Sequence, residues 1–149
     1  MTSMEKSARP LTAACTCLRL RKASRRVTQI YDHHLEPLDL TVTQYGLLGH
    51  LRAHDGVSIG VLAHLLVMDP TTLTRSLKPL ERKGFVASTP DEKDGRARRL
   101  HLTATGAVAF VAAKPAWQKA QHEIATALGA PGNQQLAESL EHLLTQLGD

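Results

Sequence analysis

Residues 58–84, SIGVLAHLLVMDPTTLTRSLKPLERKG, decide the fold because they predict two short helices with a turn between them. Ser58 suits the N-cap of the first helix. Asp69 suits the N-cap of the second, and Pro70 fits its first position, where a missing N–H needs no partner. Gly84 is a C-terminal stop. The apolar residues recur at helical spacing: Ile59, Leu62, Ala63 and Leu66 in the first helix, then Leu73, Leu77 and Leu80 in the second.

A β-hairpin follows this pair of helices directly. Residues 85–89 read as one strand and residues 98–102 as the other. The turn between them, PDEKDGR at residues 90–96, is polar and contains a glycine that permits a tight bend. Two adjacent helices followed by a two-stranded ribbon have the order of a winged helix-turn-helix. The sequence therefore predicts such a lobe over residues 41–103, with a further helix from Thr41 or Thr43 to His54.

Long helical patterns flank this lobe. One covers residues 11–36 and stops at Pro37, and the other covers residues 104–147 after an N-cap at Thr103. The second pattern carries three further signals: a bend at Pro115, a break at residues 129–132 and a new N-cap at Asn133. Leucine-striped helices of this length are more than a small monomer can bury. The expected fold is therefore mainly α with a small β-wing, dimerised through both flanking helices.

The composition fits a single domain. The chain has 149 residues, of which 42% are hydrophobic and 21% are charged, so it can bury a core. No apolar run is long enough to cross a membrane, and the polar start lacks the apolar core of a secretory signal. Two cysteines cannot build a secreted disulfide framework. We therefore expect a cytoplasmic protein.

The basic residues are concentrated in two segments. Residues 1–29 and 69–99 hold fifteen of the eighteen Lys and Arg residues, within a net charge of +4. A basic segment beside helical signals suits a polyanion, so double-stranded DNA is the expected partner. Charge alone fits a solubilising surface equally well.

The second helix of a helix-turn-helix enters the major groove, where side chains near its N-terminus reach base edges. Arg can read guanine with two hydrogen bonds, and Thr can contact a base edge or a thymine methyl. An ordinary solvated helix face is the alternative interpretation. The expected DNA contacts on and before this helix are Ser58, Thr71, Thr72, Thr74, Arg75 and Lys78.

The tip of the predicted wing is a second group of candidate contacts. Gly95 permits a tight turn that leaves Arg96 at an exposed end, from which an arginine can enter the narrow minor groove. Asp94 is expected to orient that guanidinium by an ion pair. A polar hairpin without a ligand is the alternative. The expected phosphate contacts nearby are Lys93, Arg98 and Arg99.

Five motifs together resemble the MarR family of bacterial regulators, in the family's order and spacing. They are LTVTQY at 40–45, LLVMDPTTLTR at 65–75, LERKGFV at 80–86, DGR at 94–96 and LTATG at 102–106. The resemblance covers about residues 11–147 and implies one such unit over residues 1–149, paired into a triangular homodimer with interlocked terminal helices. It implies a sequence-specific transcriptional regulator of a pseudo-palindromic operator, usually a repressor. Members are released from DNA by a small ligand, often an aromatic acid, or by cysteine oxidation.

Cys17, followed by Tyr31, is similar to the organic-hydroperoxide-sensing (OhrR) branch, in which a cysteine at this place reacts with peroxide. The chain departs from that branch at Arg21 and Val42, where tyrosines are expected. Fourteen helical residues span about 21 Å, so Tyr31 meets Cys17 only across a dimer. Cys15 and Cys17 lie on opposite sides of an ideal helix, which disfavours a bond within one chain. A redox role for both cysteines competes with a structural one.

A ligand pocket between the dimer helices and the DNA-binding lobe is implied by the resemblance. Its candidate wall residues are Tyr31, His34, His50 and Trp117.

Enzymatic chemistry has little support in the sequence. His50 and His54 lie one turn apart, but nothing completes a four-ligand set, so no metal and no cofactor is expected. No catalytic constellation is recognisable, and we expect a protein that is not an enzyme. The alternative is a small thiol-redox enzyme using Cys15 and Cys17, although no βαβ pattern surrounds the two cysteines.

Overall fold

A computed structural model describes residues 11–148 and contains a mainly helical fold with a small antiparallel sheet. None of its helices within this range is long and apolar enough to span a membrane. The helices are α1 (Leu11–Ala14), α2 (Thr16–Leu35), α3 (Val42–Ala53), α4 (Ile59–Leu65), α5 (Pro70–Arg82) and α6 (Ala104–Leu147), with a 3-10 turn η1 (Glu36–Leu38) after α2. The strands are β1 (Val57–Ser58), β2 (Val86–Pro90) and β3 (Arg98–Leu102).

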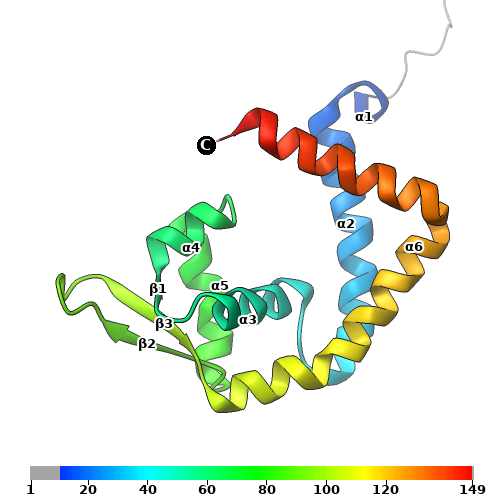
Figure 1. Ribbon diagram of the computed structural model, residues 1–149. Helices are drawn as coiled ribbons and strands as arrows, with labels where there is room; N and C mark the ends of the chain where they lie inside the picture. The colour runs from blue at the N-terminus through cyan, green and yellow to red at the C-terminus, as the bar shows by residue number, and fades with distance from the viewer. Residues whose placement is uncertain (1–10, 149) are drawn as a thin grey trace, which may run out of the picture.

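The elements form a compact lobe and an extended arm (Figure 1). The lobe contains α3, α4, α5 and the sheet, and the β2–β3 hairpin projects from it as the predicted wing. α6 leaves the base of the wing, packs against α2 and turns back toward the α1 end of α2. The predicted mainly-α winged helix-turn-helix architecture is confirmed.

The buried core, which joins the lobe to the end of α2, is made mainly of leucine and contains few aromatic residues. Each fully buried leucine contributes about 1.5–3 kcal/mol relative to an exposed one. Tyr45 is the aromatic member of the core, with 7% of its surface exposed. The largest fully buried side chains come from five different elements: Leu35, Leu47, Leu48, Leu51, Leu62, Leu73, Leu77, Leu80 and Leu100.

The predicted starts of four helices are confirmed by their capping hydrogen bonds. Each cap is a side-chain oxygen that accepts from a backbone N–H two or three residues into the helix, which satisfies a donor that has no partner within the helix. The bonds are Thr41 with Gln44 (3.2 Å), Ser58 with Val61 (3.2 Å), Asp69 with Thr72 (3.1 Å) and Thr103 with Gly106 (3.0 Å).

The sheet has one strand more than the sequence predicted. β3 lies at its centre between β1 and β2, and Val57 of β1 pairs with Leu100. β3 has the predicted bounds, whereas β2 is shifted by one residue, from the predicted 85–89 to Val86–Pro90. The N–H of Phe85 donates to the carbonyl of Leu80 at 2.9 Å, and Gly84 adopts a φ of +73°. Phe85 therefore lies in the turn that closes the C-terminus of α5, and the strand starts after it.

Both flanking helices depart from the predicted pattern. Residues 11–36 do not form one helix, because Cys15 adopts extended backbone angles (φ −92°, ψ 117°) and separates α1 from α2. In α6 only Gly129 has non-helical angles (φ 74°, ψ 157°), so the chain is helical again before Asn133, which is not a cap. Pro131 is tolerated here because it lies in the first turn after the kink, where the missing N–H needs no partner within the helix. The expected bend at Pro115 is not accompanied by non-helical angles.

The start of α6 is fixed tightly to the end of α5. The Thr103 hydroxyl donates to the Gly84 carbonyl at 2.6 Å, and the Thr103 N–H donates to the Phe85 carbonyl at 3.1 Å. Gly106 is fully packed at this junction, where a Cβ atom would lie 2.2 Å from the Phe85 oxygen and 2.8 Å from Leu102 Cδ1. The absence of a side chain at Gly106 therefore allows α6 to approach the base of the wing.

Gly106→Ala is expected to destabilise the fold by roughly 1–3 kcal/mol or more, because overpacking against backbone cannot be relieved by a rotamer change. Urea denaturation followed by far-UV circular dichroism measures the loss. Gly60→Ala is the matched control, because Gly60 is helical and exposed with open space around it, and it should be neutral or slightly stabilising. Equal midpoints for the two variants would contradict the close approach.

Candidate nucleic-acid interface

α5 is held in the lobe by one face. Leu73, Leu77 and Leu80 on that face are at most 1% exposed. The Asp69 carboxylate caps the helix, and Pro70 occupies its first turn. These contacts fix how α5 is rotated about its own axis, and so they determine which side chains face solvent.

The opposite face of α5 carries every side chain that the sequence assigned to base or phosphate contacts on this helix. Thr71, Thr72, Thr74, Arg75 and Lys78 are all exposed. A shallow hollow of about 330 Å³ follows this face and is lined by Pro70, Thr71, Thr74, Arg75 and Lys78. Thr72 does not line the hollow, and its N–H and hydroxyl donate to the Asp69 cap.

Two hydroxyl groups on α5 donate hydrogen bonds to backbone carbonyls of the helix itself. Thr74 Oγ1 donates to the Pro70 carbonyl at 2.9 Å, and Ser76 Oγ donates to the Thr72 carbonyl at 3.0 Å. A hydroxyl whose hydrogen is used in this way keeps its acceptor lone pairs. In this state Thr74 can accept from an amino group, such as adenine N6 or cytosine N4, but cannot donate to a base.

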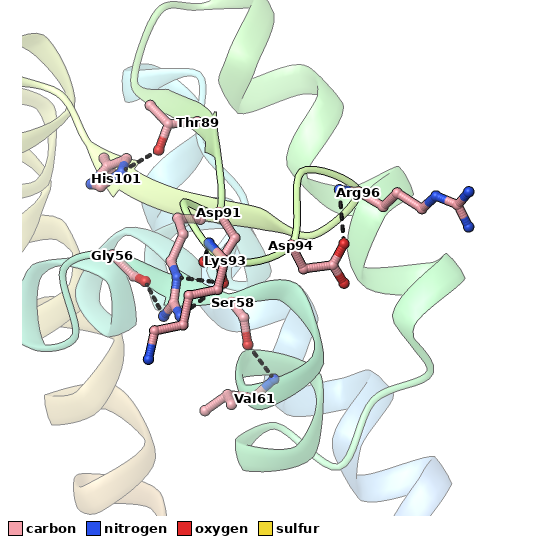
Figure 2. A network of polar contacts seen from close by, with 10 residues as sticks. Gly56, Ser58, Val61, Thr89, Asp91, Lys93, Asp94, Arg96 and His101 are labelled. Carbon is pink, nitrogen blue, oxygen red and sulfur yellow. Dashed lines mark hydrogen bonds and ion pairs between the residues drawn. The ribbon is translucent and has the colours of Figure 1, made fainter.

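The wing tip differs from the predicted arrangement in one respect. Asp94 does not pair with the guanidinium of Arg96; its Oδ1 accepts from the Arg96 backbone N–H at 3.1 Å. Figure 2 shows the Arg96 side chain extending away from the loop. Asp94 therefore shapes the turn, and the exposed arginine is left available to a ligand. Lys93, at the same tip, is exposed as well.

Two adjacent arginines on β3 have different environments. Arg98 donates to Ser88 Oγ at 3.0 Å. Arg99, which was also expected to contact phosphate, instead donates to Asp91 and to the carbonyl of Gly56. Ser58 is half-buried and its oxygen caps α4 (Figure 2), which leaves its hydroxyl hydrogen for a further partner.

The ligand-pocket candidates are divided between different places. His50 and Trp117 line one hollow of about 690 Å³ between α3 and α6. His34 lines a different hollow, where its Nε2 lies 2.7 Å from Glu123 Oε2. Tyr31 is half-buried on α2 and lines neither of them, and burial raises the pKa of its hydroxyl.

The hollow between α3 and α6 contains residues that sequence reasoning missed. Tyr45 and Phe110 stack at 4.7 Å between ring centroids, and Tyr45 and Trp117 stack at 5.8 Å. The Arg52 guanidinium lies 5.5 Å from the centre of the Phe110 ring, and Lys114 lines the same hollow. The seven-residue spacing of Phe110 and Trp117 on one helix was the available signal, since it places both rings on one face.

α3 carries two glycines beside these rings. A Cβ atom on Gly49 would lie 3.2 Å from Phe110, whereas one on Gly46 would meet open space. The aromatic and cationic groups therefore surround a hollow that the glycines keep open.

Cys15 and Cys17 are both free thiols, with Cys15 half-buried and Cys17 exposed. Among residues 11–148, no three His, Cys, Asp or Glu side chains gather as a metal site.

Comparisons with known proteins agree with this geometry. Residues 38–97 match the family model described as "MarR family". The regulator SarZ of Staphylococcus aureus is 33% identical over 90 residues, an alignment that spans 60% of this chain and 61% of SarZ. The chain thus matches about three fifths of the length of that curated relative.

Solved structures extend the likeness over nearly the whole chain. The transcriptional regulator MosR of M. tuberculosis in complex with DNA is 32% identical, with a TM-score of 0.78 over 87% of this chain and 92% of MosR. A mutant of MarR from E. coli complexed with operator DNA is 26% identical, with a TM-score of 0.80 over 90% of this chain and 97% of MarR. On the family match and these likenesses, the chain belongs to the MarR family.

Proposed function

We propose that this chain is a sequence-specific DNA-binding transcriptional regulator that acts as a repressor and not as an enzyme. The observation that carries the proposal is the division of α5 into a buried leucine face and an exposed face of Thr71, Thr74, Arg75 and Lys78. An exposed row of this chemistry suits base edges and phosphates in a major groove. The exposed wing tip with Lys93 and Arg96 suits the neighbouring minor groove or backbone. MosR and MarR, which share the fold, were both solved with DNA.

The proposed working form is a homodimer on a pseudo-palindromic operator. The arm exposes a row of leucines on the last part of α6, with further apolar side chains on α1 and α2. Exposed apolar surface of this extent indicates an interface in a protein that stays in solution. The exposed residues are Leu11, Leu20, Leu128, Leu136, Leu140, Leu144 and Leu147. A second copy covering them through residues 11–36 and 104–147 would place two lobes side by side for the two halves of a palindrome.

The proposed effector is a small aromatic acid that binds in the hollow between α3 and α6. Tyr45, Phe110 and Trp117 offer stacked ring surface, and Arg52 and Lys114 offer positive charge for a carboxylate.

Cysteine oxidation is the second proposed route of release from DNA. The interruption of the helix at Cys15 favours it, because Cys15 and Cys17 are no longer on opposite sides of one ideal helix.

DNA binding is tested by fluorescence anisotropy with the duplex upstream of the chain's own gene. If about eight to ten phosphates are contacted per dimer, the logarithm of affinity should fall with the logarithm of salt concentration at a slope of about −7 to −9.

In the same assay, Arg75→Ala should lose about 1–3 kcal/mol of discrimination at one base position. Arg96→Ala should weaken binding more evenly across sequences. Lys119→Ala, on the exposed side of α6, is the control, and a salt-independent affinity would exclude the proposal.

Effector binding is tested with benzoate as the probe and the intrinsic fluorescence of Trp117, the single tryptophan of the chain, as the readout. Benzoate should change the emission and weaken DNA binding. Arg52→Gln and Lys114→Gln should each reduce benzoate affinity about tenfold, because a charge-assisted hydrogen bond is lost. Lys119→Gln is the matched control on the same helix. Wild-type benzoate affinity in both hollow variants would show that these cations do not hold the carboxylate.

Thiol oxidation is tested with an organic hydroperoxide in the same anisotropy assay. Two thiols lose two electrons and two protons to form a disulfide, while the hydroperoxide is reduced to an alcohol and water. The wild type should lose DNA affinity, and Cys17→Ser should retain it. Non-reducing mass spectrometry distinguishes a bond between Cys15 and Cys17 from a bond between subunits. DNA binding that is indifferent to oxidant would make both cysteines structural.

A further inference from the structure

Arg99 connects the wing to the body of the lobe. Its Nη1 donates to the Gly56 carbonyl at 3.1 Å, while its Nε and Nη2 donate to Asp91 Oδ2 at 3.2 and 2.9 Å. Gly56 lies in the turn between α3 and β1, and Asp91 is the first residue after β2. The dashed lines at Gly56 and Asp91 in Figure 2 mark this connection. We call Arg99, Asp91 and the Gly56 carbonyl the wing clasp.

Asp91 also organises the loop that forms the wing tip. Its Oδ1 accepts from the Lys93 N–H at 2.9 Å, and its own N–H donates to the Ala97 carbonyl at 2.9 Å. The hydrogen bond from the Lys93 N–H, together with the Arg99 guanidinium, lowers the pKa of this carboxyl below its usual value, although desolvation acts in the opposite direction. The carboxylate is therefore ionised at neutral and mildly acidic pH. The two oxygens of Asp91 thus join the loop on one side to the lobe on the other.

His101 makes a second connection two residues further along β3. Residues two apart on a strand share one face of the sheet, so His101 lies on the same face as Arg99. Its Nδ1 lies 3.0 Å from Asp55 Oδ1, and its Nε2 lies 2.9 Å from Thr89 Oγ1 (Figure 2). Asp55 neighbours Gly56 in the turn after α3. Both side chains on this face of the central strand therefore join the hairpin to the same turn.

We propose that Arg99 and Asp91 are positioning residues for DNA binding, which set the angle at which the wing presents Lys93 and Arg96, and that Arg99 makes no phosphate contact. The inference rests on the proposed DNA-binding function. The Arg99 charge is already paired with a carboxylate, and its donors are directed to the protein on two sides. Breaking this pairing to reach a phosphate would cost the contacts that hold the wing in place.

Arg98 provides a matched comparison within the chain. It is adjacent to Arg99 in sequence and lies on the opposite face of β3, because side chains alternate along a strand. Its guanidinium donates to a neutral hydroxyl, Ser88 Oγ, so its charge remains available to a phosphate. The same substitution at the two positions therefore separates a phosphate contact from a positioning contact.

The test measures affinity for the upstream duplex at several salt concentrations in Arg98→Gln, Arg99→Gln and the double variant Arg99→Gln/Asp91→Asn. The double variant removes the clasp without changing the net charge. Both clasp variants should bind about tenfold more weakly with the wild-type salt slope, because an ion-paired hydrogen bond is lost. Arg98→Gln should reduce the magnitude of the slope by about 1. Arg99→Lys should not restore affinity, because one ammonium cannot replace the two-sided guanidinium.

Hydrogen exchange of the free protein gives a readout that does not depend on DNA. The Asp91 and Lys93 amides, which donate two hydrogen bonds of this loop, should exchange faster in Arg99→Gln than in Arg98→Gln, while the amides of the leucine core keep their protection. A reduced salt slope in Arg99→Gln, or wild-type affinity in Arg99→Lys, would identify a phosphate contact and overturn the proposal. If wild-type protein shows no salt-dependent binding, the proposed function fails instead, and the exchange data still decide whether the clasp orders the wing.

Discussion

The burial of one face of α5 is the constraint on which the rest of the molecule depends. Leu73, Leu77 and Leu80 are inserted into the core of the lobe, and successive residues of an α-helix are separated by about 100° around its axis. Fixing these leucines therefore fixes the direction of Thr71, Thr74, Arg75 and Lys78. A polar residue at any of the three buried positions would affect both stability and the orientation of the exposed face, so the exposed face depends energetically on the core beneath it.

The second constraint is the junction at which α5, the wing and α6 meet. Thr103 and Gly106 fix the start of α6 against Gly84 and Phe85, so a change in the direction of α6 acts directly on the base of the wing. The aromatic hollow lies further along the same helix, between α3 and α6. A ligand there changes DNA affinity only if it binds two arrangements of these helices with different affinities. The position of the hollow, between the lobe and the arm, is one where two such arrangements would differ.

The features that could be predicted from the sequence are those that depend on interactions between residues close together in the chain. The caps at Ser58, Asp69 and Thr103 and the leucine spacing of α5 were predicted correctly, and the start of α3 was narrowed to Thr41 or Thr43, because each depends on residues within one or two turns. The missed features depend on partners far away in the chain. β1 exists because Val57 pairs with Leu100, and Tyr45 joins Phe110 only after α3 and α6 pack. Cys15 interrupts the helix, and no adjacent proline or glycine in the sequence indicates this break. Val67 in the turn after α4 adopts a φ of +50°, which a β-branched residue disfavours and which propensity could not predict.

Formal charge overstates the positive surface that this chain offers to a polyanion. Residues 69–99 hold eight of its Lys and Arg residues, yet two of these are paired with carboxylates of the chain itself. Arg99 is paired with Asp91, and Lys83 lies 3.3 Å from Asp39 Oδ2 while also donating to the Asp39 carbonyl. A cation paired in this way would release few counterions in the proposed DNA complex, because its charge is already compensated. The salt dependence should therefore follow the unpaired cations of α5 and the wing tip. Two adjacent arginines that look equivalent in sequence, Arg98 and Arg99, have different partners because strand alternation places only one of them against an acid.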